Sequence, residues 1–271
     1  MTTDNSTEKT FSGEFLPPKS QTSELFFENR NTDHVTGYPI ETQEARGKII
    51  EIISQAIKGQ KVLGFVSGDM DNLKGVNDQC GHDNTNQGIK QFVAEREKLL
   101  LELEGAEAVL VYRPQSGGDE FRAIVIFGKD TNPNSVSEKI SEKLAIPTKF
   151  TYSQEEEKSI TLDSSFGISA EKFTGQEENA GAILQQMQEQ AENILVKQKI
   201  KKIWDEVDKT TKDGQELSPE DYIDLICQRW GSKRIPPSAL RIVLSDFYAK
   251  VLNTHFLRQT DYPSIRQNLL K

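Results

Sequence analysis

The chain of 271 residues carries a net charge of −9 at pH 7, and this acidic balance argues against a general nucleic-acid binder or a protein held on anionic membranes. Its two cysteines, Cys80 and Cys227, are too few for a disulfide framework or a zinc site, which favours a reducing, cytoplasmic setting. No segment approaches the roughly twenty apolar residues of a membrane span, so we expect no membrane insertion. The length allows one full domain plus a smaller appendage.

The first part of the chain divides into a polar arm, a helix and a strand. Residues 1–40 are rich in Thr, Ser, Asn, Asp and Glu, and we expect a mostly extended N-terminal arm whose aromatic residues dock on the domain. A helix is predicted for 41–58, because its isoleucines recur on one face. The short apolar run 61–66 follows and predicts a buried strand.

An acidic turn comes directly after that strand. Asp69 and Asp71 stand on either side of Met70, and a polar turn then leads into a helix. Carboxylates attract Mg²⁺, and free N–H groups at the start of a helix attract phosphate. This combination at one edge of a sheet is therefore suited to a metal-bound nucleotide.

A second acidic turn lies between two strand-like runs, 109–112 and 123–127. Ser116 to Phe121 read Ser-Gly-Gly-Asp-Glu-Phe, which predicts a β-hairpin whose turn needs positive φ. Two adjacent carboxylates repel each other, so such a pair usually has a cation to bind. If the strand that carries Asp69 lies beside this hairpin, the carboxylates converge on one divalent site, where two metals could clamp an in-line phosphoryl displacement.

The later segments complete one domain at 41–207 and begin another region at 208–271. The expected elements of the domain are helices at 84–104 and 133–145, strands at 149–152, 160–163 and 165–170, and a last helix with an apolar stripe from Leu184 to Leu195. A polar linker is expected at 208–214, followed by helical segments near 218–229, 237–255 and 261–270. We expect this small all-α module to serve dimerisation, regulation or binding of a protein partner.

These motifs together resemble the GGDEF-domain diguanylate cyclases over about residues 45–205. The family's Asp-x-Asp-x-Phe-Lys-x-Ile-Asn-Asp-x-x-Gly-His is similar to the segment from Asp69 to His82. Its late strand resembles Ser165 to Ala170, and its closing helix resembles Ala191 to Lys199. The resemblance implies an α+β fold of the palm or ferredoxin-like kind, with an antiparallel core sheet flanked by helices.

The resemblance also implies roles for individual residues. Asp69, Asp119 and Glu120 would be catalytic and, with the carbonyl of Met70, would bind Mg²⁺ or Mn²⁺. The nucleotide-binding residues that it implies are Asn72, Leu73, Lys74, Asn77, His82, Asn86, Gly117, Gly118 and Lys199. Two of these have an equally good structural explanation: His82 as a capping or packing residue, and Lys199 as a solvated helix lysine.

The implied reaction is the condensation of two GTP molecules into cyclic di-GMP by a homodimer. One departure concerns the base, because Asn86 replaces an aspartate that accepts from guanine. An amide offers a donor and an acceptor, so we expect relaxed or altered purine choice, with GTP favoured and ATP as an alternative.

Two positions where the family has a basic residue also differ. Gln115 replaces an arginine, and Arg113 lies farther from the glycine pair. Ile203 replaces a residue that binds phosphate, and Lys201 or Lys202 are the expected substitutes. No inhibitory product site is expected. Two alternatives stay open, an inactive nucleotide-binding or partner-binding module and a synthase of other cyclic or linear oligonucleotides from ATP or mixed purines.

Overall fold

The structure is a computed structural model that describes residues 31–71, 73–115, 118–153, 158–176 and 179–211. Most of the expected polar arm and almost all of the expected C-terminal helical module lie outside these ranges. The described elements are α2 (Gln43–Lys58), β1 (Val62–Met70), α3 (Leu73–Cys80), α4 (His82–Leu101), β2 (Ala106–Tyr112), β3 (Glu120–Phe127), α5 (Pro133–Leu144), β4 (Thr148–Ser153), β5 (Lys158–Leu162), β6 (Ser164–Lys172) and α6 (Ala180–Thr211).

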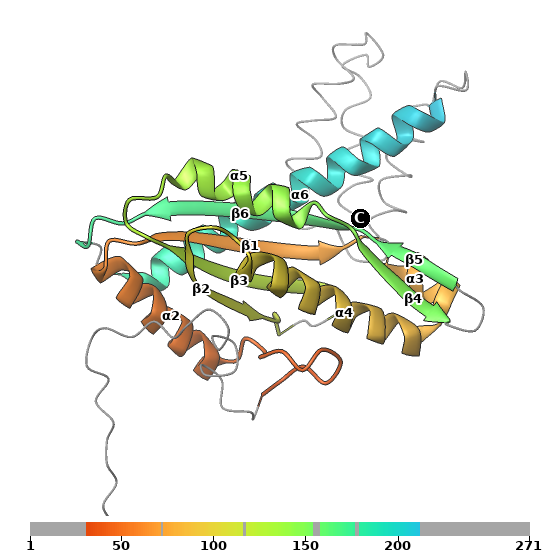
Figure 1. The fold of residues 1–271 in the computed structure, drawn as a ribbon, viewed down its shortest axis with the longest axis horizontal. Coiled ribbons are helices and arrows are strands. Elements are labelled where there is room, and N and C mark those ends of the chain that lie inside the picture. Colours follow the sequence, from red (N-terminus) through yellow and green to blue (C-terminus); the bar gives the residue numbers. More distant parts are fainter. Residues whose placement is uncertain (1–30, 72, 116–117, 154–157, 177–178, 212–271) are drawn as a thin grey trace, which may run out of the picture.

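The centre of the domain is a four-stranded sheet in the order β2-β3-β1-β6. All neighbouring strands in it are antiparallel, and β4 and β5 form a separate antiparallel pair. Figure 1 shows β1 in the middle of the sheet, with the long helix α6 crossing it and continuing past the edge. The predicted antiparallel core sheet with flanking helices is confirmed.

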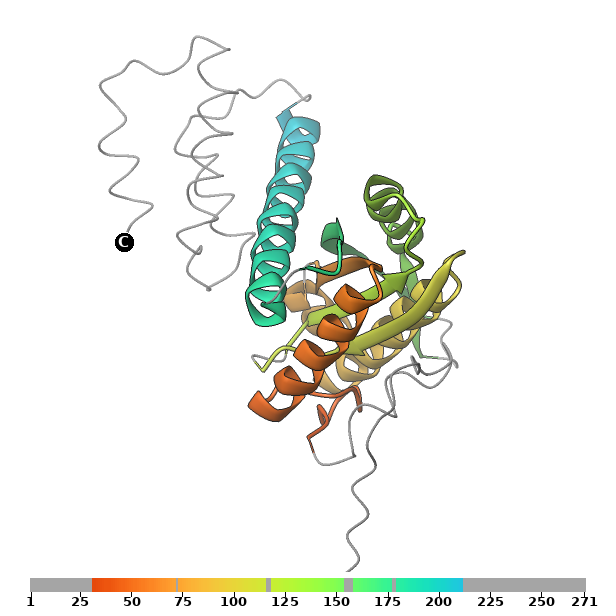
Figure 2. The ribbon, with the colours of Figure 1, turned by 90° about the vertical axis from the view of Figure 1, so that its left-hand side faces the viewer.

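Helices cover both faces of the sheet. Helices α2 and α6 pack on one face, and α4 and α5 pack on the other, as the turned view in Figure 2 shows. Side chains alternate between the two faces of a strand, so a strand covered on both sides is buried at successive positions and largely apolar. Strand β1 accordingly is buried at every position.

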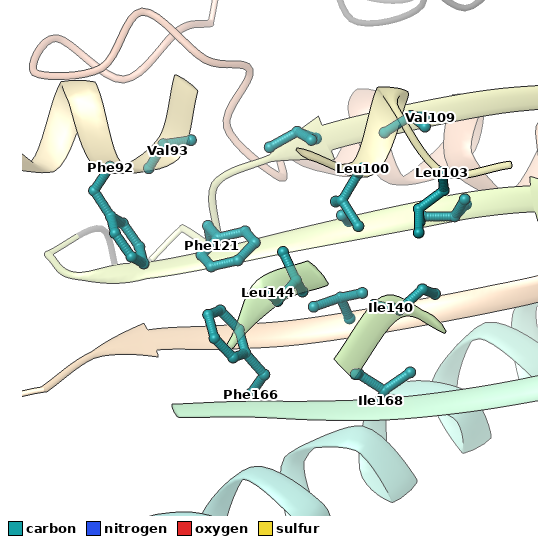
Figure 3. Close-up of a cluster of buried hydrophobic side chains, with 14 of the residues drawn as sticks. Phe92, Val93, Leu100, Leu103, Val109, Phe121, Ile140, Leu144, Phe166 and Ile168 are labelled. Atoms are coloured by element: carbon teal, nitrogen blue, oxygen red, sulfur yellow. The ribbon is translucent and has the colours of Figure 1, made fainter. Parts of the chain in front are cut away.

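The face under α4 is centred on three aromatic rings (Figure 3). Phe121 of β3 meets Phe92 of α4 and Phe166 of β6 edge to face, with ring centroids 5.8 and 5.9 Å apart. Gly68 leaves room for this packing, because a Cβ there would lie 2.1 Å from the Phe121 ring. Since Phe121 points into this core, its neighbour Glu120 points to the opposite face, toward α6.

Two elements extend beyond the local patterns that indicated them. Strand β1 continues past the apolar run 61–66 through Met70 and so carries Asp69, as expected; its pairing reaches Asp69 with β3 and Met70 with β6. Helix α6 continues through the predicted domain boundary at 207 and into the predicted linker, as far as Thr211. No glycine or proline interrupts the sequence before Gly214, so nothing local ends the helix there.

Residues 31–41 pack on the domain. Thr32 pairs with Pro39, and Ile40 pairs in parallel with Arg113 just beyond β2. The hydroxyl of Tyr38 donates to Glu97 of α4 at 2.6 Å. No helix among the described residues is both long and apolar enough to cross a membrane.

Candidate active site

The two acidic motifs meet at one edge of the sheet. Asp69 at the end of β1 lies directly opposite Glu120 at the start of β3. The amide of Met70 donates to the carbonyl of Asp119 at 3.3 Å, which fastens the hairpin turn to the end of β1. Residues directly opposite each other in an antiparallel pair share a face, so the predicted convergence of the strand and the hairpin is present.

A hydrogen bond from the side chain of Arg113 supports the hairpin turn. Gly118 has a φ of +81°, a conformation that favours glycine. Its carbonyl accepts from the Arg113 guanidinium at 2.6 Å. Arg113 is buried and lies 3.8 Å from Asp33. In the sequence Arg113 lies farther from the glycine pair than the arginine that Gln115 replaces, but the fold of the hairpin brings its guanidinium to the turn.

The carboxylate of Asp69 is buried and contacts the amine of Lys199. Burial raises the pKa of Asp69 to about 6, and repulsion from Asp119 and Glu120 acts in the same direction while Lys199 lowers it. The Nζ of Lys199 lies 2.5 Å from the Oδ1 of Asp69. Helix α6 therefore brings a cation to Asp69, and Lys199 is not simply a solvated helix lysine.

A second lysine of α6 lies at the same edge. Lys202 contacts Asp71 at 2.7 Å, Asp163 at 3.2 Å and the carbonyl of Ser164 at 2.7 Å. Ser165 also donates to Asp71, at 2.8 Å. Lys202 is one of the expected substitutes for the basic residue that the family has at the position of Ile203. It is held by Asp71 and Asp163 beside the site.

The remaining candidate residues lie on α3 and α4. Leu73 opens α3, the carbonyl of Asn77 accepts from Gly81 at 2.8 Å, and His82 opens α4. His82 and Asn86 are both exposed on α4. Asn72 and Gly117 lie outside the described residues, and only the backbone of Lys74 is described.

The oxygen atoms at the ends of β1 and β3 are the candidate ligands for the metal that the motifs predict. Within the described part of the chain, no three side chains among His, Cys, Asp and Glu are arranged to hold a metal ion. The chemistry of the site suits Mg²⁺, because the carboxylates of Asp69, Asp119 and Glu120 and the carbonyl of Met70 are hard oxygen donors. A bound cation would also relieve the repulsion that raises the pKa of Asp69.

Comparison with known proteins identifies the family. A family model described as "Diguanylate cyclase, GGDEF domain" matches residues 31–203. Among solved structures, the chain is similar to a sensory box/GGDEF family protein from Caulobacter crescentus CB15, with 22% identity, a TM-score of 0.44, and coverage of 61% of this chain and 97% of that one. It is similar to the FimX GGDEF domain from Pseudomonas aeruginosa, with 14% identity, a TM-score of 0.46, and coverage of 62% and 95%.

A third similar structure is the GGDEF domain of DgcB from Caulobacter crescentus in complex with c-di-GMP, with 18% identity, a TM-score of 0.44, and coverage of 60% of this chain and 88% of that one. A search of curated proteins found no match. The antiparallel sheet with helices on both faces defines an α+β domain of the palm-like class. Because the family model matches well over half of the chain, the protein belongs to the GGDEF family.

Proposed function

We propose that this chain condenses two purine nucleoside triphosphates, GTP in the first place, into the cyclic dinucleotide cyclic di-GMP. The observation that carries the proposal is the meeting of Asp69 and Glu120 at the paired ends of β1 and β3, with Lys199 reaching the same point from α6. Membership of the GGDEF family supports it, because the family model is that of diguanylate cyclases.

The acidic edge would hold the divalent ion. Asp69, Asp119 and Glu120, with the carbonyl of Met70, supply oxygen ligands of the type that Mg²⁺ and Mn²⁺ take. Such an ion, when bound, neutralises charge on the phosphates and lowers the pKa of an attacking hydroxyl. Asp69 is 7% exposed, and interactions between charges are stronger where water is excluded.

The neighbouring residues would hold the nucleotide. In this proposal the backbone from Asn72 to Lys74 would hold the phosphates, because the first N–H groups of a helix have no partner within the helix and suit phosphate. Lys199 adds a cation to the triphosphate, and Gly117 with Gly118 lets the nucleotide approach the hairpin backbone.

The purine would lie against a separate group on the helices. Asn77, His82 and Asn86 belong to α3 and α4, and their side chains offer both donors and acceptors to a base. This group sets the base preference in our proposal.

The reaction needs two copies of the chain. One domain holds one triphosphate and so presents one 3′-hydroxyl and one α-phosphorus. Two domains must face each other so that each hydroxyl attacks the other's α-phosphorus. Each attack forms one phosphodiester bond and releases one pyrophosphate. Activity should therefore rise more steeply than linearly with protein concentration in the range where the homodimer forms.

The test is incubation of the pure chain with GTP, ATP and their mixture in the presence of Mg²⁺ or Mn²⁺, with products identified by mass spectrometry. We expect cyclic di-GMP from GTP, and its loss in Asp69→Asn and Asp119→Asn. Asp130→Asn is the matched control, since Asp130 is an exposed acidic residue in the loop after β3. Absence of every nucleotide product from the unaltered chain would refute the proposal.

A second candidate is a non-catalytic module that binds a nucleotide or a protein partner. It is favoured by Asn86 in place of aspartate and by Gln115 in place of the family's arginine. Nucleotide binding without any pyrophosphate release would support this reading. An adenine-containing cyclic product would instead indicate a synthase that uses ATP or mixed purines.

A further inference from the structure

Arg122 lies one row along the sheet from the pair formed by Asp69 and Glu120. Arg122 follows Glu120 by two residues on β3 and therefore points to the same face of the sheet. It lies opposite Ser67, which precedes Asp69 by two residues on β1. The next row along β3 is Ile124, opposite Phe65 in the apolar core. Arg122 thus separates the site carboxylates from that core.

Arg122 joins three segments that are far apart in the sequence. Its guanidinium contacts Glu41 at 2.5 Å and Glu192 at 2.8 Å. The side chain of Glu41 is 8% exposed and also accepts from Arg46 at 2.6 Å and from Gln188 at 3.4 Å. Glu41 precedes α2, and Glu192 belongs to α6, so one side chain of β3 ties both helices of this face to the strand that carries Glu120.

The same face of α6 is fastened to the sheet at two successive rows. Glu192 and Lys199 are seven residues apart, which is close to two helical turns, so they share a face. Glu192 is bound by Arg122, and Lys199 is bound to Asp69 one row further along the strands. Because a helix moves largely as a rigid rod over two turns, the first contact constrains the second.

The junction formed by Arg122, Glu41 and Glu192 consists of ion pairs and not of apolar contacts. The partly buried pair of Arg122 with Glu41 contributes little stability beyond what apolar residues of similar volume would contribute. A geometric role is the alternative, because Arg122 has to satisfy Glu41 and Glu192 at once. The guanidinium of Arg122 meets Glu41 and Glu192 at the same time, so its position is set from two sides.

We propose that Arg122 is a positioning residue, which holds α6 through Glu192 and the entry to α2 through Glu41 so that Lys199 stays against Asp69. The contribution of this placement to triphosphate binding rests on the function proposed above. The placement of Lys199 itself does not, and it can be measured without any turnover.

The first test measures the reactivity of individual lysines in the full chain. Each amine is labelled with a small amine-reactive reagent, and its rate is read by peptide mass spectrometry. We expect Lys199 to label roughly threefold faster in Arg122→Met and in Glu192→Gln, the change that loss of one partly exposed ion pair produces. Arg122→Lys, which keeps the charge but not the two-sided geometry, should fall between these variants and the unaltered chain.

Two controls separate positioning from general loosening. Lys61→Met breaks an ion pair with Glu107, 2.9 Å long, at the opposite end of the sheet, and should leave the Lys199 rate unchanged. Lys149 on β4 serves as an internal reference in every variant. Glu192→Gln changes the half-exposed partner and so disturbs folding least. A Lys199 rate equal to that of the unaltered chain in both Arg122→Met and Glu192→Gln, or equal acceleration of all lysines, would overturn the proposal.

The second test uses steady-state kinetics with the triphosphate. We expect Arg122→Met to raise KM severalfold with a smaller change in kcat, since Lys199 contacts the bound triphosphate before reaction. A fall in kcat at constant KM would contradict the positioning role. If the unaltered chain forms no product, the function proposed above fails, while the labelling experiment still decides the role of Arg122.

Discussion

Gly167 of β6 lies so close to the backbone of Ala191 in α6 that a Cβ on the glycine would stand 1.6 Å from the Ala191 carbonyl oxygen. Gly167 is opposite Ser67, one row from the pair formed by Asp69 and Ser165. The helix therefore rests directly on the strand next to the acidic edge. This close approach brings Lys199, two turns further along α6, within reach of Asp69.

Gly167→Ala should lower the free energy of unfolding by about 1–3 kcal/mol, because backbone atoms of α6 must move to admit the methyl group. It should also weaken triphosphate binding, since the same movement displaces Lys199. Urea denaturation measures the first effect. Gly181→Ala is the control: its Cβ would meet nothing closer than 3.5 Å, so it should be neutral or slightly stabilising in a helix. Equal stability of the two variants would contradict this explanation.

Arg96 of α4 anchors the segment between α5 and β4. It is fully buried and donates to the carbonyls of Leu144 at 3.1 Å and Ile146 at 2.5 Å and to the hydroxyl of Thr148 at 3.2 Å. We expect Arg96→Ala to lower stability by about 3 kcal/mol or more, since it leaves a cavity and unpaired acceptors.

Chemical denaturation measures this effect, and Lys98→Ala provides the comparison. Lys98 is exposed on the same helix, so its removal should change stability by no more than about 0.5 kcal/mol. A loss below 1 kcal/mol for Arg96→Ala would mean that the surrounding carbonyls find other partners.

Asp33 makes part of the stability pH-dependent. Burial alone would raise the pKa of Asp33, but hydrogen bonds from Thr36 and the charge of Arg113 hold it below its ordinary value of 3.8. A carboxyl with a lowered folded-state pKa stabilises the fold above its ordinary pKa, and this contribution is lost as the pH falls through the folded value.

Asp33→Asn should therefore be less stable than the unaltered chain at neutral pH, and the difference should shrink once the pH falls below about 4. Melting temperatures between pH 3 and pH 7 measure the difference. Asp130→Asn should show no such trend, because Asp130 is exposed. A gap that stays constant down to the lowest pH would show that Asp33 acts through its shape and not its charge.

Asn86 is the residue through which we expect base preference to be set. An amide can donate to and accept from a purine, whereas a carboxylate only accepts, which suits guanine. Asn86→Asp should therefore raise the ratio of kcat/KM for GTP over ATP by about tenfold, the effect of one mismatched hydrogen bond of about 1–3 kcal/mol. Competition assays with both nucleotides measure the ratio. An unchanged ratio would remove Asn86 from base recognition.

Local patterns accounted for most elements. The helices α2 and α5 and the strands β2 and β3 begin and end within about three residues of the predicted bounds, because apolar periodicity and turn residues are local signals. The apolar run 61–66 covers only part of β1, because the end of this strand depends on pairing with β3 and β6. Helix α6 extends into the predicted linker, since polar residues do not by themselves stop a helix.

Some residues of the candidate site could be identified from the sequence, and others only from the fold. Asp69, Asp119 and Glu120 were identified from two short motifs. The roles of Arg113 and Arg122 were not, since nothing near either arginine in the sequence indicates its partners. Arg113 reaches Gly118 only because the hairpin folds back, and Arg122 meets Glu41 and Glu192 only because α2 and α6 lie on one face of the sheet.

The sequence by itself determined which chemical groups are available: three carboxylates after apolar strands, glycines at the hairpin, and lysines on the last helix. Their residue types and local spacing suffice for that, because turns and strand ends are encoded by neighbouring residues. Only the tertiary structure decided that Asp69 lies opposite Glu120 and that Lys199 contacts Asp69. Those relationships depend on strand register and on the close packing of α6 against Gly167, which arise from contacts between distant parts of the chain.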